Sequence, residues 1–254
     1  MIRYKNISLC QINVKTGQQD YYLPKNANWW GKVVEKVVIY NVPQQLSVVS
    51  PVDGQNIASG NDLIDLYLDF FNEEGQNIMH NVHAYQLSAV NNYPAEIKQK
   101  LSFELCRLHF TSAPQKDMAV MLYVFYETDE QPVEEPKENV TIRFSLANGQ
   151  RSSFADIIEK YMYARNKGVH SIAIWNGVYP DGFHTGFITL RDKSGEFAHE
   201  DLPCYFFRPV EISALGDPIL THRIPLNVVE IDFNNSYLFN TTGTKQDYII
   251  TFYY

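Results

Sequence analysis

Two short segments carry the residues whose types and spacing could support chemistry. His80 and His83 stand three apart in "MHNVHAY", and His109 could join them from a neighbouring strand to hold a zinc ion. His199 and Asp201 lie in "AHED", which could hold a cation through oxygens. Residues three apart on a strand point to opposite faces, so the first pair could share an ion only in a turn. We therefore predict no metal site, and interpret these residues as core, surface or solvated-loop residues.

Motifs that would indicate an enzyme are missing from the sequence. The chain contains no GxxxxGK[ST], GxGxxG, HExxH or GxSxG, which argues against the commonest phosphate-binding, dinucleotide-binding, zinc-protease and serine-hydrolase functions. Paired acids such as Glu73 with Glu74, or Asp192 with Glu196, fall in turn segments, where carboxylates are ordinary. The prediction is a protein that is not an enzyme, with no catalytic residues and no cofactor.

Aromatic residues near the N-terminus are the first candidates for binding. "TGQQDYYLPKNANWWGK" places Tyr21, Tyr22, Trp29 and Trp30 among Asn, Gln and Gly residues. Large aromatic side chains need cover, which could come from the chain's own first domain or from a neighbouring subunit, where Trp and Tyr anchors concentrate binding energy. We predict these four residues as an interface, and docking in cis stays open as the alternative.

A second aromatic group lies in the other half of the chain. Tyr179 and Phe183 in "GVYPDGFH", with Trp175 nearby, could stack on a sugar. The same three residues could also form an exposed interaction loop or cover the edge of the core. They are the predicted ligand-binding residues, with a glycan as the ligand.

Charge and cysteine content limit the partners. The net charge of −8 over 254 residues repels phosphate backbones and anionic lipid heads, so we expect neither nucleic acid nor membrane as a partner. The N-terminus has no apolar stretch of the kind found in signal peptides. The cysteines are far apart in the sequence and form no CxxC motif; they are Cys10, Cys106 and Cys204. This pattern predicts buried thiols in a reducing compartment.

Short β-branched and aromatic runs between turn signals predict strands along most of the chain. Their spacing favours an all-β, mainly antiparallel sandwich over alternating βαβ units. One short helix is predicted over residues 153–168, where apolar residues recur at helical spacing after Ser153, and a helical turn is predicted from Pro94. The predicted strands are 36–40, 66–71, 83–87, 103–110, 118–126, 141–146, 171–175, 186–191, 204–207, 228–233 and 248–253.

An acidic, proline-containing stretch, "TDEQPVEEPKEN", divides the chain. It cannot bury enough apolar surface to offset the entropy lost on ordering, which predicts a solvated linker, and a long hairpin loop within one domain is the alternative. The predicted organisation is an N-terminal arm over 1–30, a first β domain over 31–127, the acidic linker over 128–139 and a second β domain over 140–254.

Two segments with an offset of 120 residues repeat one pattern. "LYLDFFNEEGQNIMHNVHAYQL" and "GFITLRDKSGEFAHEDLPCYFF" each give a strand, a turn with Gly at one fixed place, and a second strand. With small shifts, "LCRLHFTSA" aligns with "VVEIDFNNS", and "MLYVFYE" aligns with "YIITFYY". Duplication is the favoured interpretation. The alternative is that unrelated β-hairpins share alternation and a turn glycine.

The segments "LPCYFFRPVEI", "VVEIDFNNSYL" and "QDYIITFYY" resemble the closing strands of jelly-roll capsid or capsid-associated proteins of bacteriophages. The resemblance implies two tandem jelly-roll-like β-sandwich domains in a viral structural protein. The chain is shorter than full-size double jelly-roll major capsid proteins, which favours a minor, vertex or auxiliary component of the virion, made in the host cytoplasm. Its implied partners are other virion proteins and further copies of itself. A carbohydrate-binding or host-attachment module is the alternative.

Overall fold

The computed structural model describes residues 6–25, 28–42, 44, 46–88, 96–126, 139–155, 169–176, 186–193, 197–207, 211–212, 218–219, 225–228, 231–241 and 244–253. The chain divides into two compact units, one formed by Ile7–Thr128 and the other by Asp129–Tyr254 with Met1–Asn6. The fold is mainly antiparallel β, as the sequence predicted. Within the described ranges, no helix is both long enough and apolar enough to cross a bilayer.

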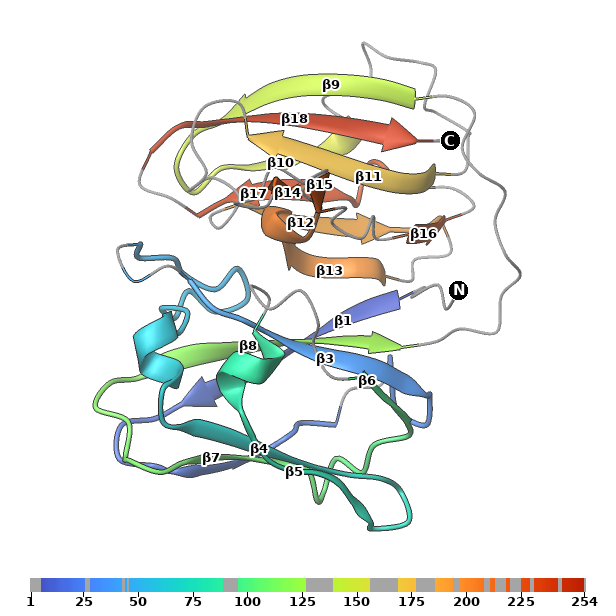
Figure 1. Ribbon diagram of the computed structural model, residues 1–254. Coiled ribbons are helices and arrows are strands. Elements are labelled where there is room, and N and C mark those ends of the chain that lie inside the picture. The colour runs from blue at the N-terminus through green and yellow to red at the C-terminus, as the bar shows by residue number, and fades with distance from the viewer. Residues whose placement is uncertain are drawn as a thin grey trace. The chain divides into compact units, whose positions relative to one another are not determined.

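The described part of the first unit contains eight strands in two layers (Figure 1). The order across one layer is β1-β8-β3-β6, and across the other it is β2-β7-β4-β5. The first strand thus lies beside the last and the third beside the sixth, which is the strand order of a jelly roll. The strands are β1 (Asn6–Val14), β2 (Asp20–Tyr22), β3 (Val34–Tyr40), β4 (Leu66–Phe71), β5 (Asn77–His83), β6 (Glu96–Gln99), β7 (Arg107–Phe110) and β8 (Met118–Tyr126).

The core of the first unit is hydrophobic and draws on both layers. β8, "MAVMLYVFY", is buried at every position and pairs antiparallel with β3, with Leu122 opposite Ile39. A continuous apolar run of this kind suits a strand that is covered on both faces. Side chains from the other layer complete the core, among them Tyr21, Leu66, Leu68, Phe70, Leu108 and Phe110.

The second unit repeats this architecture. Its layers have the orders β9-β18-β11-β16 and β10-β17-β12-β13. If the two-residue pair β14 (Glu211–Ile212) and β15 (Pro218–Ile219) is set aside as an insertion, these orders are again 1-8-3-6 and 2-7-4-5. The other strands are β9 (Asn139–Leu146), β10 (Arg151–Ser153), β11 (Val169–Asn176), β12 (Gly186–Arg191), β13 (Phe197–Pro203), β16 (Pro225–Val228), β17 (Tyr237–Asn240) and β18 (Gln246–Tyr253).

Register confirms the predicted alignment of the two hairpins at an offset of 120 residues. β4 and β12 match, β5 and β13 match, and each hairpin is followed by a 3-10 turn, η2 (Ala84–Leu87) or η4 (Cys204–Phe207). Both hairpins also have a register shift at the same place, and each has a residue with positive φ there, Asn81 at 53° and Asp201 at 44°. A shared β-bulge is a more specific likeness than alternation alone.

A different offset relates the strands that follow. The counterpart of β7 is β17, which lies 130 residues later, so the predicted match of "LCRLHFTSA" with "VVEIDFNNS" was wrong. The side chains at Cys106 and Ser236 show the correct match, because each contacts the backbone N–H and C=O of the last residue of β4 or β12. The insertion that carries β14 and β15 lies between β13 and β16. The offset between matching residues of the two units therefore changes after the hairpin of β12 and β13.

Two predicted strands are 3-10 turns. The segments 83–87 and 204–207 contain η2 and η4, because their buried residues recur at a spacing of three, as in Ala84 and Leu87. Among its described residues, 228 and 231–233, the predicted strand over 228–233 contains the last residue of β16 and an isolated bridge at Ile231. The predicted helical turn from Pro94 contains strand β6 instead. Residues 156–168 of the predicted helix lie outside the described residues.

The predicted N-terminal arm is also corrected. Residues 6–14 and 20–22 form β1 and β2 of the first jelly roll, so the described part of residues 1–30 belongs to the domain predicted to start at residue 31. β1 supplies Cys10, Ile12 and Val14 to the core, which explains why this segment is ordered within the sandwich. The acidic linker, residues 128–139, lies outside the described residues except for Asn139, and its role stays a prediction.

Candidate functional site

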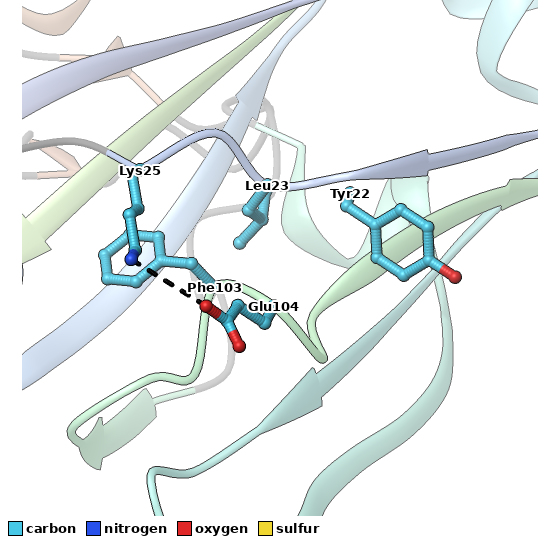
Figure 2. A pocket seen from close by; sticks show the side chains of 5 residues that line it. All are labelled: Tyr22, Leu23, Lys25, Phe103 and Glu104. Carbon is cyan, nitrogen blue, oxygen red and sulfur yellow. Dashed lines mark ion pairs between the residues drawn. The ribbon is translucent and has the colours of Figure 1, made fainter.

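A shallow depression lies on the first unit beside the end of β2 (Figure 2). Its volume is about 410 Å³. Tyr22 comes from β2, Leu23 and Lys25 follow it along the chain, and Phe103 and Glu104 come from the turn before β7. The backbone N–H of Leu23 donates to the carbonyl of Cys106 at 3.2 Å, which joins the two segments that line the depression.

The floor of the depression is firmly packed. Phe103 is 4% exposed, and its ring lies 4.1 Å from the ring of Trp29, which is itself 1% exposed. Tyr21 is 7% exposed, packs edge-on against Phe110, and accepts a hydrogen bond from the Lys15 N–H at 2.8 Å. Two of the four predicted interface residues, Tyr21 and Trp29, therefore lie in the core of their own unit.

The rim of the depression carries exposed rings and opposite charges. Tyr22 is 61% exposed and Trp30 is 58% exposed, so the interface prediction still applies to these two. The Lys25 Nζ lies 5.0 Å from the centroid of the Trp30 ring and 3.7 Å from the Glu104 Oε1. Leu105, 44% exposed, follows Glu104 in the same turn. Adjacent tryptophans thus have opposite roles, one under the surface and one on it.

The three histidines weighed as zinc ligands contact separate partners. The His80 Nδ1 lies 2.9 Å from the Asp69 Oδ1, the His109 Nδ1 lies 2.8 Å from the Asp20 Oδ1, and the His83 Nε2 lies 2.8 Å from the carbonyl of Ile64. In the described part of the chain, no group of three or more His, Cys, Asp or Glu residues is placed to hold a metal ion.

Asp69 is a polar centre that the sequence did not reveal. It interrupts the apolar strand β4, and its side chain is nearly covered. Its Oδ1 accepts a hydrogen bond from the N–H of Asn81 in the β-bulge at 2.7 Å, and its Oδ2 accepts one from the Arg107 Nε at 2.8 Å. Burial acts to raise the pKa of this carboxyl, but the Asn81 N–H, Arg107 and His80 outweigh burial, so its pKa lies below the ordinary value.

Asp201 occupies the matching bulge of the second unit. Its N–H donates to the Thr189 Oγ1 at 3.0 Å, and its Oδ1 accepts from that hydroxyl at 3.0 Å and from the Tyr237 hydroxyl at 3.3 Å. Burial raises the pKa of Asp201, since its hydrogen-bonding side chains are neutral. "AHED" was interpreted as a solvated loop, but these residues are part of β13, and Asp201 is 6% exposed.

The other candidate residues are partly outside the structure's description. Trp175 lies in β11 with its backbone opposite Ile249, but its side chain, like all of Tyr179 and Phe183, falls outside the described residues. Their role in ligand binding stays a prediction.

The three cysteines are buried and unpaired with one another, and burial raises the pKa of the Cys10 thiol to about 12 and that of Cys106 to about 11. Such thiols stay protonated at neutral pH.

Comparison with known proteins gives little further information. No known family matches the chain, and no curated protein is similar in sequence. Among solved structures, a chain from the "X-ray structure of the entire lipid-containing bacteriophage PM2" is similar with a TM-score of 0.23 and 9% identity, over 95% of this chain. The match covers 48% of that chain, so the protein spans about half of its length.

Proposed function

We propose that this protein is a non-enzymatic structural subunit of a bacteriophage particle, serving as a minor, vertex or auxiliary capsid component. The observation that carries the proposal is the repeated strand order, 1-8-3-6 and 2-7-4-5, in both units. Jelly rolls of eight strands are typical of viral capsid proteins, and also occur in lectins and cupins. Two such units in one chain provide two sets of sheet faces for contacts within a particle.

The packing of the first unit favours an assembly role over chemistry between the sheets. Its interior is filled by hydrophobic side chains from both layers, including Val34, Leu68, Phe70, Leu108 and Leu122. A catalytic site or ligand cavity between the sheets would need space or polar groups in that interior. The polar clusters found here lie instead on the outer side of β4 and β7, where a partner protein can reach their rims.

Tyr22 and Trp30 are the residues we propose for a contact with other virion proteins or with further copies of the chain. Exposed Trp and Tyr side chains beside a rim of charge are typical anchors of protein interfaces. The proposed location is the virion, after synthesis in the host cytoplasm. The exposure of these side chains, 58% for Trp30 and 61% for Tyr22, supports this contact.

Electron microscopy combined with mass spectrometry tests the proposal. Particles purified from the producing lysate should contain this chain in a fixed ratio to the other particle proteins, and labelled antibodies should locate it on the particle. Analytical ultracentrifugation of the purified chain tests self-association in parallel. A chain that is monomeric at all concentrations and absent from washed particles would contradict the structural role.

A further inference from the structure

We infer that the depression formed by Tyr22, Leu23, Lys25, Phe103 and Glu104 is a binding site for a neutral pyranose, such as the terminal sugar of a glycan. This function goes beyond assembly, and it uses the Tyr22 ring in copies of the chain where no virion partner covers that ring. The depression is open, and its volume of about 410 Å³ suits a single sugar ring that stays partly exposed.

The depression offers the two kinds of contact that a sugar ring needs. The apolar C–H face of a pyranose can stack on an aromatic ring, and the Tyr22 ring stands exposed at one side (Figure 2). The hydroxyl groups of a sugar both donate and accept hydrogen bonds. The Lys25 ammonium supplies donors and the Glu104 carboxylate supplies acceptors, and these side chains are 60% and 81% exposed.

The pairing of charges selects a neutral ligand. The Lys25 Nζ and the Glu104 Oε1 lie 3.7 Å apart, so the pair presents one donor group and one acceptor group with no net charge. An anionic sugar attracted by Lys25 would also meet Glu104, and the chain as a whole carries a net charge of −8. A polar, uncharged ring can bond to both groups without this cost.

Burial of the floor argues against a protein side chain as the occupant. Leu23 is 6% exposed and Phe103 is 4% exposed, so little apolar area remains for a leucine or tryptophan anchor to cover. Within the lining, the Tyr22 ring and the two charged heads remain exposed, and Trp30 and Leu105 lie on the rim outside it. These groups suit a ligand that is itself polar around its edge and apolar on its faces.

The backbone and the floor of the depression are held in place before any ligand binds. The Leu23 N–H bond to Cys106 fixes the chain beside Tyr22, and the Trp29 ring supports Phe103 from below. Lys25 is oriented by the Trp30 ring, 5.0 Å from its Nζ. A fixed backbone and floor lower the entropy lost on binding.

Saturation-transfer NMR on the full chain tests the inference. The probes are the methyl glycosides of glucose, galactose, mannose and N-acetylglucosamine, with methyl glucuronide as the anionic comparison. At least one neutral glycoside should bind with a Kd of roughly 1 mM or below. Tyr22→Ala should weaken that binding about tenfold, which is the effect expected for loss of one stacking ring. Val52→Ala, at a residue 58% exposed elsewhere on the first unit, should leave it unchanged.

A charge variant separates the proposed chemistry from nonspecific stacking. Glu104→Gln should weaken binding of the neutral glycoside, because an acceptor is lost. It should improve binding of the glucuronide, because the repelling carboxylate is gone. Circular dichroism and thermal melting confirm that each variant is folded. The inference is overturned if no neutral glycoside binds, if glucuronide binds the wild-type chain best, or if folded Tyr22→Ala binds unchanged. If Trp30→Ala reduces assembly while no glycoside binds, the surface is a protein contact instead.

Discussion

Asp69 in the first unit and Asp201 in the second are acidic residues at matching β-bulges. Asp69 supplies the acceptor of the hydrogen bond across the bulge, whereas Asp201 supplies the donor. In the first unit the strand residue Asp69 accepts a hydrogen bond from the N–H of the bulge residue Asn81. In the second unit the strand residue is Thr189, and its hydroxyl accepts from the N–H of the bulge residue Asp201. The backbone geometry is shared, whereas the charge has changed position.

The surroundings of the two carboxylates differ accordingly. Asp69 lies against the cationic Arg107, and its pKa is lowered despite burial. Asp201 lies against the hydroxyls of Thr189 and Tyr237, and burial raises its pKa. A bulge with a left-handed residue needs an acceptor for its N–H but not a particular charge. The fold therefore fixes the position of the acceptor, and the sequence of each unit decides whether it is ionic.

Removing the carboxylate of Asp69 should give the largest effect. Asp69→Ala leaves the Asn81 N–H without its acceptor and Arg107 without its partner, which should lower the free energy of unfolding of the first unit by about 2–3 kcal/mol. Urea denaturation measures this loss, and hydrogen exchange at the Asn81 amide locates it. Asp69→Asn, which keeps an acceptor, should cost less. Asp20→Ala, at an exposed acid paired with His109, is the control and should be close to neutral. Equal losses for Asp69→Ala and Asp20→Ala would contradict the role given to the bulge contact.

The matching change in the second unit should be smaller. Thr189→Val removes the acceptor of the Asp201 N–H and one donor to the carboxylate, but Tyr237 still donates, so we expect a loss of about 1–2 kcal/mol. Thr189→Ser retains the hydroxyl and is the matched control. Hydrogen exchange at the Asp201 amide should quicken in the valine variant and change little in the serine variant. An unchanged amide in the valine variant would show that the second bulge does not depend on this contact.

Three mainly apolar strands were predictable to the residue. The segments 66–71, 118–126 and 186–191 are buried strands with the predicted bounds, because β-branched and aromatic residues continue up to a clear turn signal. β1 was missed although Ile7 and Leu9 alternate with polar residues, as do Ile12 and Val14, since the alternation changes phase across Cys10 and Gln11. β2 has three residues, too few for any periodicity.

The candidate sites depended on contacts that sequence pattern does not encode. Trp29 and Trp30 are chemically identical neighbours, and only the turn closed by the Lys32 N–H bond to the Trp29 carbonyl puts one ring on Phe103 and leaves the other exposed. The network around Asp69 needs the bulge and the register of three strands. Its one visible sign was a lone acid within an apolar strand, which usually requires a partner when buried.

Acid should affect the two bulges in opposite directions. The folded pKa of Asp69 is below its ordinary value of 3.8, so its contribution to stability is present above that value and is lost as pH falls through the folded pKa. The folded pKa of Asp201 is above 3.8, so its contribution is full below 3.8 and is lost as pH rises through the folded pKa.

Hydrogen exchange at the Asn81 and Asp201 amides, corrected for intrinsic rates, measures this divergence. On acidification from neutral pH, protection at Asp201 should rise first, and protection at Asn81 should fall only at lower pH. The loss of protection at Asn81 in acid should be smaller than in Asp69→Ala, because a protonated carboxyl still has an acceptor oxygen. The matched controls are Asp69→Asn and Asp201→Asn, each of which should flatten the pH dependence of its own unit. A parallel response of the two amides would contradict the assignment of opposite shifts.

The smallest effect should come from exchanging the residues that hold the end of β4 or β12. The Cys106 Sγ accepts from the Phe71 N–H at 3.2 Å, and the Ser236 Oγ accepts from the Arg191 N–H at 3.0 Å in the matching place. Burial raises the pKa of Cys106 to about 11, so its thiol also keeps a proton to donate to the Phe71 carbonyl.

Cys106→Ser preserves both contacts with a slightly smaller side chain, and should change the free energy of unfolding by less than about 1 kcal/mol. Cys106→Ala removes both contacts, and should cost about 1–2 kcal/mol. Urea denaturation of the two variants under reducing conditions gives the comparison. Equal losses would mean that the shape of the side chain, and not its contacts with Phe71, is what the two jelly rolls share at this position.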